Sequence, residues 1–242
     1  MVSPHLHTTM DRGTRDRNSR TVIASKISSL FYSLEPSMYH EVASKVEFWT
    51  EYALTEHWIT VDQLVEEVSL LAWQNHRSHA SVARFLVEFR DAPHRSDQAK
   101  SFVDELCLYV LRWFAAASAE NLSGQSRESW YPCDGSRVAA WGGGGFIGAA
   151  SFVGYLIEWG LLGHELVRRH LVKPLIAHRY GDRDDAQKSV RVMAIYQLFV
   201  AARSSLLQGL LEPEDVQACF KILETKISLD GIVRPDVAKL NV

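Results

Sequence analysis

The basic side chains between His164 and Arg191 are the residues of this sequence best suited to bind a charged partner. Seven bases meet four acids in this stretch, which gives a formal balance of +3. Five of the bases fall on one broad helical face or in the turn after it, where they would suit RNA phosphates or an acidic protein surface. These candidate binding residues are Arg168, Arg169, Lys173, Arg179 and Arg183. The alternative is a solvated helix face, because the four acids dilute the positive charge.

The histidine and cysteine residues do not form a catalytic or metal-binding pattern. His76 and His79 lie three residues apart, but no carboxylate is placed to complete a zinc site, so we expect a surface pair at a helix turn. Cys133 lies beside Tyr131 and Pro132 in a stretch that places no base next to the thiol. The sequence therefore predicts no metal site and no cysteine nucleophile.

The glycine run Gly142–Gly145 does not have the pattern of a phosphate-binding loop. No strand is predicted before it, and no lysine followed by serine or threonine closes it. The sequence also contains no Gly-x-Ser-x-Gly nucleophile elbow and no paired-acid signature. We therefore expect no catalytic residue, no cofactor and no enzymatic activity.

The overall charge does not select a partner, but the charge is unevenly distributed. The 242 residues carry a formal charge of −3, which favours neither nucleic acid nor an anionic membrane. Between Glu35 and Glu67, however, eight acids meet one base, a balance of −7. Cys107, Cys133 and Cys219 are odd in number and far apart, which favours a reducing compartment. We expect a cytoplasmic location, with the nucleus as the alternative.

The elements that position these residues are predicted to be helices, because apolar residues recur at helical spacing and no stretch shows the period-two alternation of a strand. The nine predicted helices cover residues 22–34, 37–54, 60–73, 78–91, 97–121, 146–160, 164–179, 185–207 and 213–227. In the second helix we expect Val42, Val46 and Trp49 to be buried. Thr60 and Gln63 have the spacing of a capping box at the start of the third.

The predicted organisation is one helical domain over residues 21–230. The polar segment 1–20 lacks the apolar stretch of a secretory signal, and we expect a disordered lead-in there. Residues 122–145 are rich in glycine and are predicted to form an internal loop, and residues 231–242 an irregular tail. Residues 138–157 carry no charge over a length that could span a membrane, but six of them are glycine. We therefore expect no membrane span.

Nine helices joined mostly by short turns favour a HEAT-like α-solenoid, an all-α stack of antiparallel helix pairs with about 40 residues per pair. Such stacks present long edges and concave faces to other macromolecules. The sequence therefore predicts a non-catalytic adaptor or scaffold that binds other macromolecules. The alternatives are a general protein-interaction α-solenoid with no RNA role, and a membrane-associated helical protein.

The segment FVGYLIEWGLLGHELVRRHLVKPL, residues 152–175, resembles the middle domain of eukaryotic translation initiation factor 4 gamma, a HEAT-repeat domain of the armadillo-type superfamily. LFYSLEPSMY, residues 30–39, and SVARFLVEF, residues 81–89, are similar to parts of its first two repeats. The residues that carry the family motif are Phe152, Gly154, Leu156, Gly160, Leu161 and Leu162. The sequence departs from the family at Glu35, where threonine is usual, and at Pro174, within a helix that is normally continuous.

The resemblance implies both a fold and a set of partners. Members of that family dock a DEAD-box RNA helicase and contact RNA, so it implies an adaptor in translation initiation or mRNA metabolism. Physically, Gly160 and Gly163 are interpreted as positions that permit a positive φ or a close backbone approach. The oligomeric state does not follow from the sequence.

Overall fold

The computed structural model describes residues 12–74, 77–123, 143–169, 185–203 and 212–223. Within these residues every regular element is a helix and none is a strand, so the predicted all-α class is confirmed. The elements in chain order are α1 (Arg12–Tyr32), η1 (Pro36–Met38), α2 (Tyr39–Thr55), α3 (Val61–Ser69), α4 (Leu71–Gln74), α5 (His79–Asp91), α6 (Asp97–Ser123), α7 (Gly143–Glu158), α8 (His164–Val167), α10 (Asp185–Ala202) and α11 (Pro213–Leu223).

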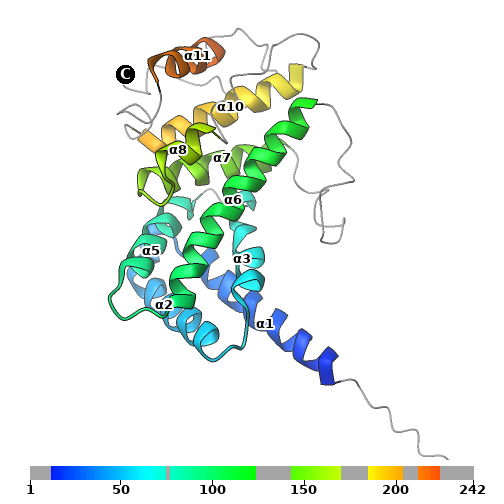
Figure 1. Ribbon diagram of the computed structural model, residues 1–242, viewed down its shortest axis with the longest axis vertical. Coiled ribbons are helices and arrows are strands. Elements are labelled where there is room, and N and C mark those ends of the chain that lie inside the picture. The colour runs from blue at the N-terminus through cyan, green and yellow to red at the C-terminus, as the bar shows by residue number, and fades with distance from the viewer. Residues whose placement is uncertain (1–11, 75–76, 124–142, 170–184, 204–211, 224–242) are drawn as a thin grey trace, which may run out of the picture.

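Helix α6 links an N-terminal group of helices to a C-terminal helix pair (Figure 1). It contacts α2, α3 and α5 in the first group and α7 in the second. Helix α1 packs on α2, α3 and α4, whereas α7 packs most extensively on α10. In Figure 1, α7 and α10 lie far from the start of α1, and α11 lies beyond α10.

A continuous hydrophobic core joins the two groups. The Phe31 ring of α1 is fully buried and contacts Phe85 of α5 edge-on, with 5.4 Å between ring centroids, and Phe102 of α6 at 6.2 Å. Phe114 of α6 stacks on Phe146 of α7, with centroids 4.7 Å apart. Such aromatic pairs contribute about 0.5–1.5 kcal/mol each beyond the burial of their area. Helix α6 is thus held by aromatic contacts on both sides.

Several predicted helix boundaries are wrong. Helix α1 begins at Arg12, so residues 12–20 are helical rather than a disordered lead-in. A helix that packing has already nucleated extends at little cost per residue, which explains the longer N-terminal end. Helix α6 reaches Ser123 and α7 begins at Gly143, so the predicted internal loop is shorter at both ends. The rest of that loop and the predicted tail 231–242 lie outside the described residues.

The start of the predicted third helix is confirmed, but its end is not. The Gln63 amide donates to Thr60 Oγ1 at 3.3 Å and the Thr60 amide donates to Gln63 Oε1 at 3.1 Å, which completes the capping box. Helix α3 ends at Ser69, and α4 follows after Leu70. The Ser69 hydroxyl donates to the Glu66 carbonyl at 2.8 Å, a local bond of the kind that competes with regular helix.

Tyr39, the first residue of α2, ties this helix to α5. Its hydroxyl donates to Glu88 Oε2 at 2.5 Å, and the Arg84 guanidinium lies 4.3 Å above its ring while donating to Glu88 Oε1 at 2.7 Å. Burial raises the pKa of Glu88, but the hydrogen bonds from Tyr39 and Arg84 outweigh burial and lower that pKa below its ordinary value. Glu88 therefore accepts two hydrogen bonds as a carboxylate.

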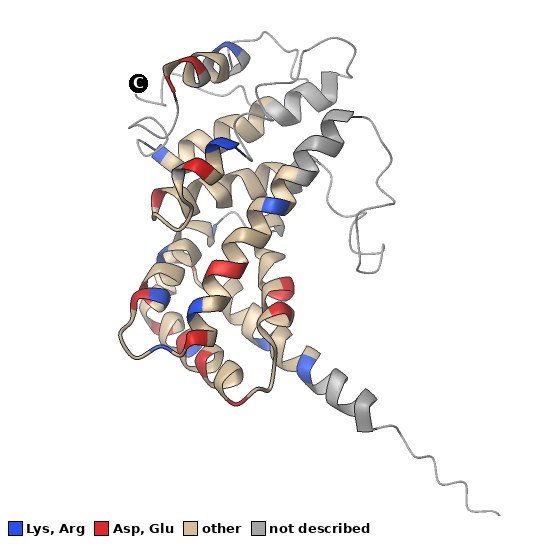
Figure 2. Ribbon diagram, viewed as in Figure 1, with Lys and Arg blue, Asp and Glu red and all other residues tan. Residues whose placement is uncertain are grey.

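Helix α7 contains most of the uncharged stretch that the sequence analysis weighed as a membrane span. The described part of α7 carries one charged residue, Glu158 at its end (Figure 2). Gly154 faces α10 so closely that a Cβ atom there would lie 2.7 Å from Ala201 Cβ and 2.7 Å from the Leu198 carbonyl oxygen. The missing side chain lets the two helices approach. No helix in the described part of the chain is long and apolar enough to cross a membrane.

Gly160 ends α7 in the left-handed conformation, with φ of +69°. Its amide donates to the Ile157 carbonyl at 2.9 Å, and the Leu161 amide donates to the Leu156 carbonyl at 2.8 Å. This pair of bonds is a Schellman motif, which closes a helix end when the residue after the cap has a positive φ. The interpretation of Gly160 is therefore confirmed. The same interpretation is wrong for Gly163. This residue has no positive φ, and a Cβ atom added to it would have no atom within 4 Å.

Candidate functional site

The buried face of α2 differs from the predicted one, and the difference creates an unusual surface. Val42 and Val46 are buried as expected, but the next buried residues are Thr50, Ala53 and Leu54. Trp49, expected in the core, lies on the surface. The small side chains of Thr50 and Ala53 occupy the contact with the neighbouring helices, so the inward stripe continues at i+4 from Val46 rather than at i+3.

Four large aromatic side chains gather on the exposed side of α2 and the turn after it. The exposed fractions are 59% for Phe48, 43% for Trp49, 38% for Tyr52 and 40% for Trp58. Phe48 and Tyr52 are one helical turn apart, and their rings are parallel within 7° with centroids 5.8 Å apart. Tyr52 contacts the Trp58 ring edge-on at 4.8 Å, and Phe48 contacts Trp49 in the same way at 5.5 Å. These four residues are called the aromatic cluster below.

A second Schellman motif folds Trp58 back onto α2. His57 adopts a positive φ of 56°, its amide donates to the Leu54 carbonyl at 3.2 Å, and the Trp58 amide donates to the Ala53 carbonyl at 2.9 Å. The chain reverses direction there, which brings the Trp58 ring over Tyr52. Backbone hydrogen bonds therefore fix the position of the outermost ring of the aromatic cluster.

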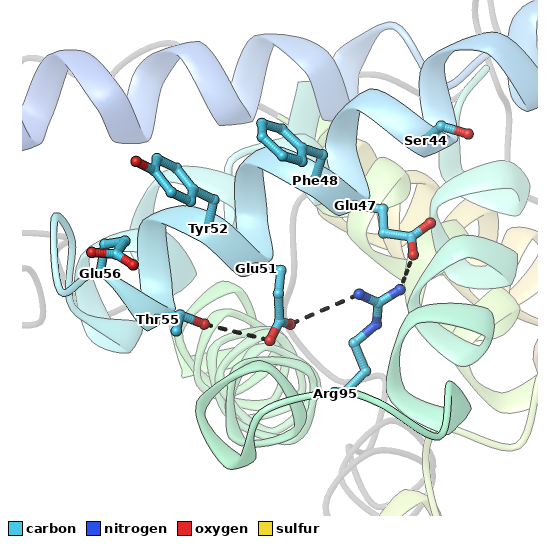
Figure 3. Close-up of a pocket in the computed structure, with 8 residues that line it drawn as sticks. All are labelled: Ser44, Glu47, Phe48, Glu51, Tyr52, Thr55, Glu56 and Arg95. Carbon is cyan, nitrogen blue, oxygen red and sulfur yellow. Dashed lines mark hydrogen bonds and ion pairs between the residues drawn. The ribbon is translucent and has the colours of Figure 1, made fainter.

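Beside the aromatic cluster lies an open depression of about 570 Å³, called the α2 pocket (Figure 3). Its lining residues are Ser44, Glu47, Phe48, Glu51, Tyr52, Thr55, Glu56 and Arg95. Three carboxylates and one guanidinium give this lining a formal charge of −2. Phe48 and Tyr52 point one way from α2, whereas Glu47 and Glu51 point toward Arg95 (Figure 3).

Arg95, from the loop between α5 and α6, closes one side of the α2 pocket. Its guanidinium forms a hydrogen-bonded ion pair with Glu47 and lies 3.9 Å from Glu51 Oε2. The guanidinium also covers the buried Phe89 ring, with 4.7 Å between Arg95 Cζ and the ring centroid. Glu51 also accepts the Ser96 amide at 3.1 Å. Glu51 thus holds the α5–α6 loop on α2, while Glu47, 46% exposed, still faces solvent.

The structure describes two of the five residues of the predicted basic patch. Arg168 and Arg169 follow α8, where Arg169 is exposed and Arg168 forms an ion pair with Glu212 at 3.2 Å. Lys173, Arg179 and Arg183 lie outside the described residues.

The prediction that His76 and His79 form a surface pair is wrong for His79. His76 lies outside the described residues. His79 is fully buried, its Nε2 donates to the Leu71 carbonyl at 3.0 Å, and its ring lies 5.1 Å from that of Phe152. Among the described residues no three His, Cys, Asp or Glu side chains gather as a metal site. Burial raises the pKa of the Cys107 thiol to about 12, so this thiol is protonated at neutral pH.

The six residues of the family motif have structural positions. Phe152, Leu156 and Leu162 are buried in the core and Leu161 is partly buried, while Gly154 and Gly160 have the roles described above. The comparisons with protein-family models, curated proteins and solved structures find no match to this chain.

The aromatic cluster was not singled out by the sequence reasoning. The signal was present, because four aromatic residues fall between Phe48 and Trp58 among carboxylates at Glu51 and Glu56. Spacing alone, however, does not tell an inward aromatic residue from an outward one.

Proposed function

We propose that this chain is a non-catalytic adaptor that binds another protein through the aromatic cluster and the α2 pocket. The observation that carries the proposal is the exposure of four adjacent large rings on one helix and its turn. Contiguous apolar surface of this kind marks interaction sites in proteins, and tryptophan and tyrosine dominate the energy of protein interfaces. Isolated exposed apolar residues would not indicate an interaction site. These rings contact one another and form one patch.

The surrounding structure suits a binding role. The rings project from α2, which packs against α1, α5 and α6, so the patch is held by a helical framework. A rigid aromatic side chain loses little conformational entropy on binding, which favours affinity. The same helices fit a HEAT-like α-solenoid of antiparallel pairs, and that arrangement is part of the proposal.

The resemblance to the initiation factor 4 gamma middle domain adds a partner to the proposal. It makes a DEAD-box RNA helicase the first protein to test, in translation initiation or mRNA metabolism. RNA contact through Arg168 and Arg169 is a separate element of the same proposal. It rests on fewer described residues than the protein-binding surface does.

The test is quantitative affinity purification from the native organism with three tagged chains: the parent, a Phe48→Ala/Tyr52→Ala double variant, and Trp159→Ala. Trp159 is an exposed ring outside the aromatic cluster, so its variant controls for loss of any surface aromatic residue. We expect a defined partner that the parent and Trp159→Ala retain and the double variant loses. An unchanged set of partners in the double variant would contradict the adaptor proposal. If no helicase is among the recovered partners, only the helicase part of the proposal is wrong.

A further inference from the structure

We infer that the partner segment that docks on the α2 pocket and aromatic cluster is a positively charged polypeptide segment with arginine or lysine side chains. This inference rests on the proposed function and adds the chemistry of the partner. Three properties of the surface carry it: the charge around the rings, the exposure of the aromatic side chains, and the way in which the chain already holds one of its own arginines.

The charge of the surface favours a cationic partner. The pocket lining has a formal charge of −2, and all of its residues except Arg95 belong to the stretch from Glu35 to Glu67, which has a balance of −7. Glu56 follows Tyr52 at the end of α2 and is exposed, so it can meet an incoming charge, whereas Glu47 is half-exposed and pairs with Arg95. The same carboxylates repel phosphate groups, so this face is unsuited to RNA. Charge complementarity of this kind raises association rates and rejects partners of the wrong sign.

The rings supply the second recognition element. Aromatic faces attract guanidinium and ammonium groups, with tryptophan the strongest and tyrosine and phenylalanine next. Phe48 and Tyr52 are parallel neighbours with exposed surface, and Trp58 extends the patch beyond Tyr52. An arginine side chain can lie flat on such a ring while its N–H groups reach a neighbouring carboxylate. Glu56 follows Tyr52 by one helical turn and is placed for that second contact.

The chain already displays this mode of binding at the opposite wall of the pocket. The guanidinium of Arg95 lies on the Phe89 ring. It also pairs with Glu47 and Glu51 (Figure 3). A partner arginine on the Phe48 and Tyr52 side would repeat the combination of ring face and carboxylate with residues that Arg95 does not cover.

The experiment measures fluorescence polarisation of a short labelled peptide that alternates arginine with leucine, against the same peptide with neutral citrulline in place of arginine. Each exposed cation–π contact corresponds to about two- to fivefold in affinity. We therefore expect the citrulline peptide to bind at least about fivefold more weakly. The Phe48→Ala/Tyr52→Ala and Glu56→Gln variants should each weaken binding of the arginine peptide by a similar factor. Glu47 and Glu51 are left intact because they hold Arg95 and Ser96 of the α5–α6 loop on α2.

The controls are Trp159→Ala and Glu105→Gln, which remove an exposed ring and an exposed charge elsewhere and should leave binding unchanged. Thermal melts of every variant confirm that it is folded. Equal binding of the arginine and citrulline peptides, no binding of the arginine peptide to the parent, or cluster-dependent binding of a single-stranded RNA oligonucleotide would each overturn the inference.

The outcome also separates the inference from the proposed function. If the native partner is lost in the Phe48→Ala/Tyr52→Ala variant but the arginine peptide does not displace it from the parent, the adaptor proposal stands and the cationic partner is wrong. If the set of native partners does not change in that variant, both fail.

Discussion

Replacement of Gly154 by alanine gives a direct test of the contact between α7 and α10. The new Cβ atom would lie 2.7 Å from Ala201 Cβ, 2.7 Å from the Leu198 carbonyl oxygen and 3.1 Å from the Ala202 amide nitrogen. Non-bonded carbon atoms prefer separations of about 3.5–4.0 Å. Two of the three obstructing atoms belong to the α10 backbone, so a change of rotamer cannot relieve the clash. Helix α10 must therefore move away from α7 by about 1 Å.

The cost follows from that movement. A gap of about 0.5–1 Å forfeits a quarter to a half of the attraction at each contact, and overpacked cores lose about 1–3 kcal/mol. Alanine regains up to about 1 kcal/mol over glycine through its helix propensity. We expect Gly154→Ala to lower the free energy of unfolding by about 1–2 kcal/mol, and Gly154→Val by more because its branched side chain adds bulk. In a chain of this size the alanine variant should lower Tm by about 2–8 °C.

The neighbouring glycines provide matched controls in urea and thermal unfolding followed by circular dichroism. Gly163→Ala meets no atom within 4 Å and should stay within about 0.5 kcal/mol of the parent. Gly160→Ala also meets no atom, but its φ of +69° should cost about 1–2 kcal/mol. Ala201→Gly added to Gly154→Ala should recover part of the loss. A Gly154→Ala chain as stable as the parent would refute the packing of α7 on α10.

Further predictions concern four other positions. His57→Gly should stabilise the chain by up to about 1 kcal/mol in urea melts, because glycine removes the strain of a positive φ, and a loss of stability would contradict the turn after α2. The pKa of Glu88 is lower in the folded chain than its ordinary value of 4.5. Its contribution to the free energy of unfolding is therefore present above pH 4.5 and is lost as the pH falls through the lower pKa of the folded state. Glu88→Gln should therefore flatten the acid side of the stability–pH curve, and an unchanged curve would contradict the network. With the other two cysteines replaced by serine, the buried Cys107 should react with a thiol reagent only as fast as the chain unfolds, so rapid labelling of the native protein would contradict its burial. Arg169→Glu leaves the ion pair of Arg168 in place. If this segment binds phosphates, the variant should bind unrelated RNA sequences more weakly by the same factor, and its RNA affinity should depend less steeply on salt concentration. Unchanged RNA binding would exclude Arg169 from the RNA contact.

Much of the fold is predictable because its signals are local. The buried stripe of α5, with Val82, Phe85, Leu86 and Phe89, follows directly from helical spacing, and all four residues are buried. The capping box at Thr60 is equally local, since both hydrogen bonds join residues three apart. Such features need no knowledge of neighbouring helices.

The candidate site is not predictable in the same way, because tertiary packing decides it. After Val46 the inward stripe of α2 can continue at Trp49 or at Thr50, and the hydrophobicity of tryptophan favours the wrong choice. Only the helices packed on α2 select the smaller residue. Arg95 reaches Glu47 across a sequence separation of 48 residues, so no local pattern indicates that contact. The surface therefore becomes visible only when the helices are placed together.

Site-specific photo-crosslinking in the native organism tests directly whether a partner docks on α2. A benzophenone amino acid replaces Phe48 in one chain and Trp159 in another, and crosslinked partners are mapped to the residue. We expect a single partner to crosslink at Phe48, through a segment with arginine or lysine residues, and Trp159 to give no such product. Failure of Phe48 to crosslink above the level of Trp159 would contradict a docking surface on α2.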